Sequence, residues 1–149
     1  MDLLQEYPVV IKLPVQWGDQ DALGHVNNVV FFRWWESSRI AYAEQINLLG
    51  ADRSERFGTV LASMKCDFRQ QILYPDSVSI GARIARVGNS SLHIEHRLVS
   101  DQTETVAAEA VSVMVSFDFK TQISCQINPE IRSAIQRLEP LTRADGVNG

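Results

Sequence analysis

The strongest constraint on the fold is a change of hydrophobic period along the chain, from helical to alternating. Between Val29 and Gly50 the apolar residues recur every three or four positions, which is the period of an α-helix. They form two stripes: Phe31, Trp35, Ser38, Tyr42 and Ile46 on one face, and Val30, Trp34, Ser37 and Ala41 on a second. A helix covered over so much of its circumference belongs inside a core, and Gly50 is expected to end it.

From Thr59 onward the pattern alternates between apolar and polar residues, as in strands with one buried face. Four such segments cover residues 61–70, 77–87, 92–98 and 104–119. Residues 9–17 read as a first strand, in which Pro14 marks an edge position or a bulge. The order of one strand, one helix and four strands predicts an α+β fold. Its five-stranded antiparallel sheet would bury one face against the long central helix.

The length of 149 residues suits one hydrophobic core, so we predict a single domain over residues 1–149. Near its end, residues 128–139 read as a short amphipathic helix, with Asn128 as the N-cap and Pro129 in the first position. A disordered tail is expected from about residue 142.

Charge and hydropathy argue against several kinds of partner. The formal net charge of -4 gives no broad attraction to nucleic acid or to anionic membranes. The most apolar run, Val29 to Trp35, contains Arg33 and is followed by Glu36, so it is too short to cross a bilayer. The first residues are acidic where a signal peptide would be basic. We therefore expect a cytoplasmic protein without nucleic-acid or membrane partners.

Before the helix, the stretch WGDQDALGHVNN, residues 17–28, concentrates acidic, imidazole and amide side chains. A calcium loop that began at Asp19 would need side-chain oxygens at its fifth and twelfth positions. Those positions are Leu23 and Val30 here, and neither side chain has an oxygen. A transition-metal site built from Asp19, Asp21 and His25 finds no support elsewhere in the sequence. We therefore expect neither a metal nor another cofactor.

The same stretch has the groups needed for acyl transfer. The first backbone N–H groups of the helix, near Asn28, can polarise a carbonyl and stabilise an oxyanion. Asp21 precedes them in the loop, and a carboxylate there can attack a polarised carbonyl or activate a water to do so. Gly24 allows a tight turn and close approach of a substrate. Asn27 or Asn28 can also cap the helix, but capping requires neither Asp21 nor a histidine.

Residues 15–40 resemble the 4-hydroxybenzoyl-CoA thioesterase-like branch of the hot-dog proteins. The shared pattern is an aromatic residue, Gly or Glu, then Asp-x-Asp-x-x-Gly, and a central helix with Glu and Arg near its middle. The resemblance continues more loosely to about Phe119. It implies a hot-dog fold, with the sheet wrapped around the helix, and hydrolysis of an acyl-CoA thioester to the free acid and CoA. It also places the catalytic carboxylate at Asp21 and the polarising amide at about Asn28.

The segment HVNN, residues 25–28, also resembles the plant acyl-carrier-protein thioesterases. In that family the equivalents of Asp21 and His25 belong to the catalytic set, whereas the asparagine between them is Leu23 here. An acyl-carrier-protein thioester therefore stays open as a substrate beside acyl-CoA. On the helix, Glu36 and Arg39 are three residues apart and are expected to form an ion pair.

The resemblance also implies where the rest of the substrate is held. In relatives, basic residues near the turn between strands three and four meet the CoA phosphates; here this turn offers Arg86, Ser90 and Ser91 but lacks a basic cluster. Hot-dog relatives pair two sheets edge to edge and bind substrate between subunits, which also protects an exposed sheet edge. We therefore expect a homodimer or homotetramer in which Val60 and Leu61 of one chain line the site of its neighbour.

Two other functions stay open at this point. A hot-dog hydroxyacyl-thioester dehydratase would use a histidine and a carboxylate for proton transfer, and His25 is available, although the Asp-x-Asp-x-x-Gly spacing favours the thioesterase. A non-catalytic acyl-CoA-binding protein belongs to a different class. It would normally carry a DNA-binding segment, for which the sequence has no basic helix.

Overall fold

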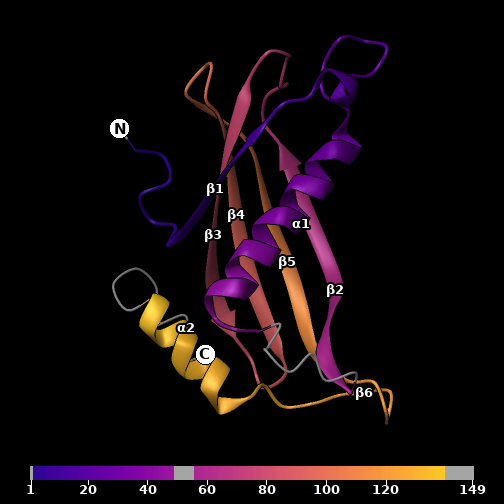
Figure 1. Cartoon of the computed structure of the whole chain (residues 1–149), viewed down its shortest axis with the longest axis vertical. Coiled ribbons are helices and arrows are strands. Elements are labelled where there is room, and N and C mark those ends of the chain that lie inside the picture. The colour runs from indigo at the N-terminus through magenta and orange to yellow at the C-terminus, as the bar shows by residue number, and fades with distance from the viewer. Residues whose placement is uncertain (1, 49–55, 140–149) are drawn as a thin grey trace.

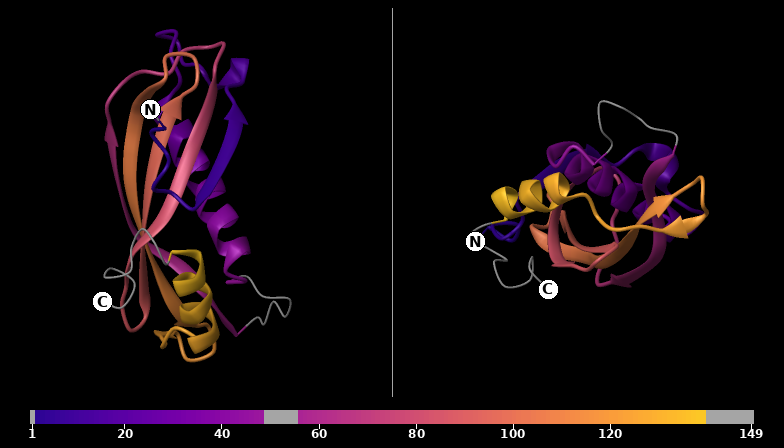
Figure 2. Two further views of the ribbon diagram at one scale, coloured as in Figure 1. Left: turned by 90° about the vertical axis from the view of Figure 1, so that its left-hand side faces the viewer. Right: turned by 90° about the horizontal axis from the view of Figure 1, so that it is seen from below.

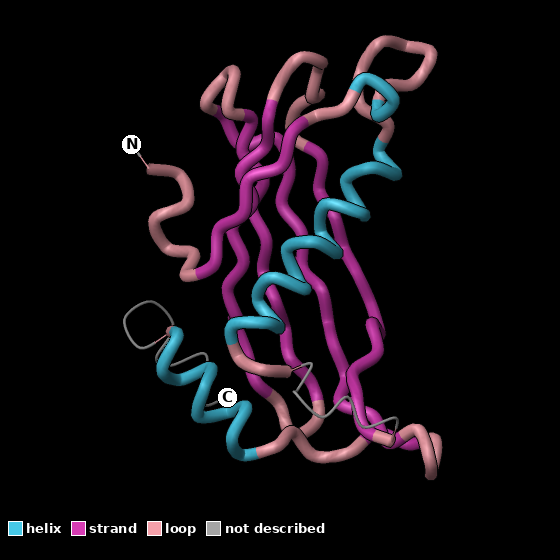
Figure 3. Tube along the Cα trace, viewed as in Figure 1, coloured by secondary structure: helices cyan, strands magenta, loops and turns pink. Residues whose placement is uncertain are grey.

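A computed structural model describes residues 2–48 and 56–139. The elements are β1 (Val9–Pro14), the 3₁₀ helix η1 (Trp17–Asp19), α1 (Asn28–Gln45), β2 (Phe57–Phe68), β3 (Ser77–Val87), β4 (Ser91–Ser100), β5 (Thr105–Asp118), β6 (Ile123–Ser124) and α2 (Pro129–Leu138). Figure 1 shows α1 crossing one face of a single long sheet, and Figure 3 shows the same path by secondary structure.

The sheet is antiparallel throughout, in the order β1-β3-β4-β5-β2, with the short β6 added beside β5. Seen from below, it curls around α1 as a wrapped half-barrel (Figure 2). The predicted α+β hot-dog architecture is confirmed. Strand β6 was not predicted, because two residues are too few to show a period. Pro14 ends the edge strand β1, as its missing N–H requires.

The first predicted stripe is buried: Phe31, Trp35, Ser38 and Tyr42 of α1, and Ile46 just past its end. The second stripe is buried only near the start of the helix. The helix ends at Gln45, before the predicted stop, and the chain then turns through a left-handed residue with φ of 55° at position 47. Gly50 and the tail expected from about residue 142 lie outside the described residues, and the single-domain boundaries stay a prediction.

The alternating patterns of β3 and β4 place their apolar residues on the inner face, against α1. In β2 the alternation holds from Met64 to Phe68 but breaks at Ala62, where a bulge interrupts the pairing with β5. The valines of β5 share one face, as the pattern indicated. This face is the outer one. Val111 pairs with Glu95 of β4, whereas its neighbour Ala110 pairs with His96, which is buried on the inner face.

The C-terminal helix is confirmed, and it closes the lower end of the core (Figure 1). Asn128 caps it by accepting the Glu130 N–H at 2.8 Å. Just beyond its end, the buried Glu139 accepts the Tyr42 hydroxyl at 2.6 Å. Burial, then the hydrogen bond to this carboxylate, raises the pKa of Tyr42 far above its ordinary value. Neither described α-helix is long and apolar enough to cross a membrane.

An N-terminal arm ahead of β1 covers part of the outer face. Leu4 and Tyr7 are buried there, and the guanidinium carbon of Arg83 lies 4.6 Å from the centre of the Tyr7 ring. The arm can approach closely because position 81 is glycine. A Cβ on Gly81 would lie 2.6 Å from the Cβ and Cγ of Tyr7, well inside van der Waals contact.

We therefore expect Gly81→Ala to destabilise the protein by about 1–3 kcal/mol, because the added methyl must displace the Tyr7 side chain. Urea unfolding followed by circular dichroism measures the effect. Gly18→Ala is the matched control, since nothing lies within 4 Å of a Cβ at that position. Equal stability of the two variants would contradict this account of the arm.

Candidate active site

The loop between β1 and α1 is organised around Asp19. Its side chain is buried, and Oδ2 accepts the backbone N–H of Gln16 at 2.8 Å. Its backbone carbonyl accepts the N–H of Asn27 at 3.0 Å, and Oδ1 lies 3.7 Å from the guanidinium of Arg33. Asp19 therefore holds the two ends of the loop together rather than facing solvent.

Asp21 occupies a tight turn that leaves one of its carboxylate oxygens available. Oδ1 accepts the N–H of Leu23 at 2.8 Å, and the Gly24 N–H donates to the Asp21 carbonyl at 3.1 Å. Gly24 has a φ of 85°, a conformation that glycine adopts without strain. Oδ2 lies 4.0 Å from Nδ1 of His25, and both side chains are about one quarter exposed, at 28% and 25%. The turn thus joins the carboxylate and the imidazole at an accessible position.

The start of α1 supplies the expected amide donors. The side chain of Asn27 caps the helix by accepting the Val29 N–H at 3.0 Å. Within the described parts of the chain, no acceptor bonds to the N–H of Asn28, the first helical residue. A bridge between Gln20 and Val26 closes the loop, so the Asp21 turn and the helix start belong to one compact unit. An uncapped amide at the positive end of a helix dipole can bind a carbonyl oxygen.

The other predicted site residues lie elsewhere in the chain. Val60 and Leu61 belong to β2, which forms an edge of the sheet, and Leu61 is 45% exposed. Arg86, Ser90 and Ser91 lie around the β3–β4 turn, at the end of the sheet opposite the loop between β1 and α1 (Figure 1). One chain therefore places Asp21, Gly24, His25 and Asn28 in one closed loop, and these five residues lie outside it.

Arg132 is a basic residue at that turn which the sequence pattern missed. From α2 its guanidinium donates to the carbonyl of Gly88 at 2.6 Å and to that of Asn89 at 3.3 Å. It is 44 residues away from Gly88 in the chain, so no local signal indicated it. The packing of α2 adds a positive charge to a turn whose own residues include no basic cluster.

A buried polar cluster beneath α1 was also missed. His96 is 1% exposed, and its Nδ1 and Nε2 lie 2.9 Å from the Ser38 hydroxyl and 3.1 Å from the Ser112 hydroxyl. Burial, followed by the charge of Arg39, lowers the pKa of His96 to about 3, so the imidazole is neutral near pH 7. The pattern had placed His96 on the inner face, but nothing in it showed that two serines meet there.

The expected ion pair between Glu36 and Arg39 is wrong. No contact within 4.0 Å joins them in the described structure, and Glu36 is exposed. Arg39 instead reaches toward the sheet, where Nη1 lies 3.3 Å from Sδ of Met64 and 3.4 Å from the Ser112 hydroxyl. The helix spacing alone could not reveal this, because it is the sheet that supplies the competing partners.

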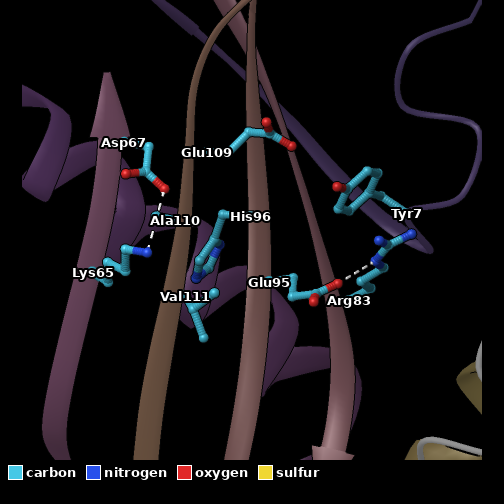
Figure 4. A pocket seen from close by; sticks show the side chains of 9 residues that line it. All are labelled: Tyr7, Lys65, Asp67, Arg83, Glu95, His96, Glu109, Ala110 and Val111. Atoms are coloured by element: carbon cyan, nitrogen blue, oxygen red, sulfur yellow. Dashed lines mark hydrogen bonds and ion pairs between the residues drawn. The ribbon is translucent and has the colours of Figure 1, made fainter. Parts of the chain in front are cut away.

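A hollow of about 170 Å³ lies on the outer face of the sheet, lined by charged residues (Figure 4). These charges neutralise one another: Arg83 Nε is 2.8 Å from Glu95, and Lys65 Nζ is 3.9 Å from Asp67. The hollow faces away from α1, so we assign it no chemistry. Among the residues that the structure describes, no three His, Cys, Asp or Glu side chains are grouped to hold a metal.

Sequence comparison identifies the family. Residues 15–135 match the model of the thioesterase-like superfamily, a span that contains the loop between β1 and α1, α1 itself and the whole sheet from β2 onward. The chain belongs to the thioesterase-like superfamily. That membership, with structural neighbours named as thioesterases, supports a thioester hydrolase.

Three relatives illustrate the similarity. A thioesterase from Thermus thermophilus, solved with coenzyme A and Zn, is 33% identical, covering 92% of this chain and 98% of that one, with a TM-score of 0.79. The PA2801 protein from Pseudomonas aeruginosa is 30% identical, covering 85% and 96%, with a TM-score of 0.75. The uncharacterized protein YsmA from Bacillus subtilis is 32% identical over 85 residues, which span 57% of this chain and 56% of that relative.

The neutral state of His96 predicts a pH-dependent stability. The folded pKa of about 3 lies below the ordinary value of 6.5, so the unfolded chain binds the proton first. The contribution of His96 to the free energy of unfolding is therefore fully present above pH 6.5. It falls by about 1.4 kcal/mol per pH unit as the pH drops from 6.5 toward 3. Urea unfolding between about pH 7 and pH 4 should show this slope reduced in His96→Gln. His93→Gln, on the outer face of β4, is the control, and unchanged slopes in both variants would refute the assignment.

Proposed function

We propose that the protein hydrolyses an acyl-CoA thioester to the free acid and CoA, with Asp21 as nucleophile or general base. The observation that carries this proposal is the pairing of a partly exposed carboxylate with an uncapped helix amide in one closed loop. The Asp21 turn presents Oδ2, and the Asn28 N–H has no acceptor within the described structure. A carbonyl oxygen bound at that amide would bring its carbon toward the carboxylate.

The chemistry can follow two routes from this arrangement. As a nucleophile, Asp21 attacks the carbonyl carbon, CoA leaves as the thiolate, and water then hydrolyses the mixed anhydride. As a general base, Asp21 takes a proton from a water that attacks directly. In both routes the Asn28 amide stabilises the developing oxyanion. His25, 4.0 Å from Asp21, orients the carboxylate or the water.

The coenzyme A arm is assigned to the β3–β4 turn. The Thermus relative was solved with coenzyme A, which supports a CoA thioester as the substrate class. Ser90 and Ser91 offer hydroxyls at this turn, while Arg86 and Arg132 bring positive charge to the same end of the sheet. An acyl-carrier-protein thioester remains a second candidate substrate, because its phosphopantetheine arm presents the same thioester.

Because the turn lies at the opposite end of the sheet from Asp21, we propose that two chains share each site. Exposed apolar side chains in the loop and at the start of α1 support this: Trp17 is 73% exposed, Leu23 81%, Val29 65% and Phe32 41%. The Phe32 ring lies 6.5 Å from that of Phe68 on the edge strand β2, centre to centre, and exposed apolar residues near a free edge strand favour a protein interface. A second copy paired along β2 would cover it, making a homodimer or, by further association, a homotetramer.

No specific observation favours the two alternatives. A hydroxyacyl-thioester dehydratase would use His25 and Asp21 for proton transfer, but the uncapped helix amide beside them suits an oxyanion. A non-catalytic acyl-CoA-binding protein would have no use for a carboxylate held in a dedicated turn. Hydration of an enoyl-CoA without hydrolysis, or binding without turnover, would identify either one.

We expect Asp21→Asn to lower kcat for acyl-CoA hydrolysis by about 100-fold or more, because it removes the nucleophile or base. The loop should stay folded, since the asparagine Oδ1 can still accept the Leu23 N–H. Release of free CoA thiol measures the rate over a panel of short, long and aryl acyl-CoAs. Glu36→Gln, which removes an exposed carboxylate of α1, is the matched comparison. Loss of hydrolysis in Glu36→Gln together with retained hydrolysis in Asp21→Asn would assign the catalytic role to the helix instead.

Sedimentation at micromolar concentration should show a dimer or larger assembly. Leu61→Asp should shift it toward monomer and lower activity in parallel, because a charge at the β2 edge opposes pairing. Val10→Asp places the same charge at a residue that is 49% exposed on the other edge strand, and it should leave assembly unchanged. A fully active monomer would exclude a shared site.

A further inference from the structure

The inner face of β2 runs beside α1 as a row of side chains that ends at a guanidinium. Phe31 contacts Phe68 near the start of the helix and Arg39 contacts Met64 two turns later. Between them, Cys66 packs against the core cluster that contains Trp35. The Phe31 and Phe68 rings are 5.1 Å apart, centre to centre. The row therefore begins near the catalytic loop and leads away from it along the helix.

This row is partly open because α1 packs mainly on β1, β3 and β4. Met64 and Cys66 are only half-buried although they face the core, and Phe68 is 47% exposed. Burial raises the pKa of the Cys66 thiol, which favours the neutral thiol over the thiolate and suits an apolar lining group. The accessible part of the row is therefore its β2 side, formed by Met64, Cys66 and Phe68, whereas Phe31 and Trp35 of the helix are buried behind it.

Arg39 at the end of the row has no anionic contact in the described structure. A guanidinium has five N–H donors, but its recorded acceptors are the Met64 sulfur and the Ser112 hydroxyl, both neutral. No carboxylate lies within 4.0 Å of it in the described residues. Desolvation lowers the pKa of Arg39, and the more distant charge of Glu36 offsets this only in part. A partly desolvated cation of this kind gains strongly from a carboxylate.

The spacing suits a ligand attached at the catalytic loop. Arg39 lies eleven residues beyond Asn28, roughly 16 Å along the helix axis. Helix side chains point back toward the N-terminus, so the guanidinium lies closer to the first amide than this axial distance. An acyl chain of medium length is therefore the class of ligand that we test.

We propose that Arg39 selects acyl groups that carry a carboxylate at their distal end, an inference that rests on the proposed thioester hydrolysis. The thioester lies at the helix start, the chain runs along the apolar row, and the terminal carboxylate meets the guanidinium. Ser112, held by His96, keeps Arg39 turned toward the sheet. Glu36 on the same helix is the competing anion, but its side chain is exposed whereas Arg39 is directed inward.

The test compares matched substrates that differ only at the distal end. Octanoyl-CoA and the mono-CoA thioester of octanedioic acid have the same number of carbons, and hexanoyl and decanoyl pairs bracket the length. We expect wild-type kcat/KM to favour the carboxylate member about tenfold or more, as for a hydrogen bond to a charged group. Arg39→Gln should abolish this preference, and Arg39→Lys should keep part of it. Lys65→Gln removes a charge from the outer face of β2 and should leave the preference intact.

The outcomes separate this inference from the proposed function. Equal rates for matched substrates in the wild type, or a preference that survives in Arg39→Gln, would overturn the role of Arg39 while leaving thioester hydrolysis standing. Dissociation of Arg39→Gln into monomers would assign the residue to the subunit interface instead. Absence of hydrolysis for every substrate would refute the proposed function itself. Should Arg39→Gln not fold, the wild-type preference and Arg39→Lys decide the question.

Discussion

The burial of α1 against the curved sheet is the constraint on which the rest of the structure depends. Trp35 and Tyr42 are completely inaccessible, and burying side chains of this size contributes about 2–3 kcal/mol each. The sheet can curl around the helix because the inner rows of β3 and β4 are largely apolar, with His96 buried among them. Packing of the helix on the sheet also sets the position of its N-terminus. The first helical amides therefore lie next to the loop that carries Asp21.

Loop and helix support each other chemically. Asp19 is buried so that its oxygens tie Gln16 and Asn27 together, and Asn27 in turn caps the helix. The capping bond goes to Val29, which leaves the amide of Asn28 for a ligand. The two aspartates of the loop therefore differ in their contacts. Asp19 is buried and holds the loop together, whereas Asp21 is partly exposed and keeps one carboxylate oxygen accessible.

Helix α1 is not centred on the sheet, and this position explains why the β2 edge stays open. Because α1 covers β1, β3 and β4 more fully than β2, one sheet edge and its lining stay open. The polar cluster of Ser38, His96 and Ser112 lies where this open side meets the closed core. Each nitrogen of the imidazole has a hydroxyl partner, which makes a neutral buried histidine tolerable. Arg39 emerges from the same cluster toward the open edge.

The sequence by itself determined the architecture and the position of the loop that we propose to be catalytic. Periodicity located the central helix and four strands, and the Asp-x-Asp-x-x-Gly motif located Asp21, Gly24, His25 and Asn28, because these features depend on neighbours a few residues apart. Only the tertiary structure decided which groups meet across the fold. It paired His96 with two serines, took Arg39 from Glu36 to the sheet, and brought Arg132 to the β3–β4 turn. Those contacts join residues that are 16 to 73 positions apart. They depend on strand register and helix packing, which no local pattern encodes.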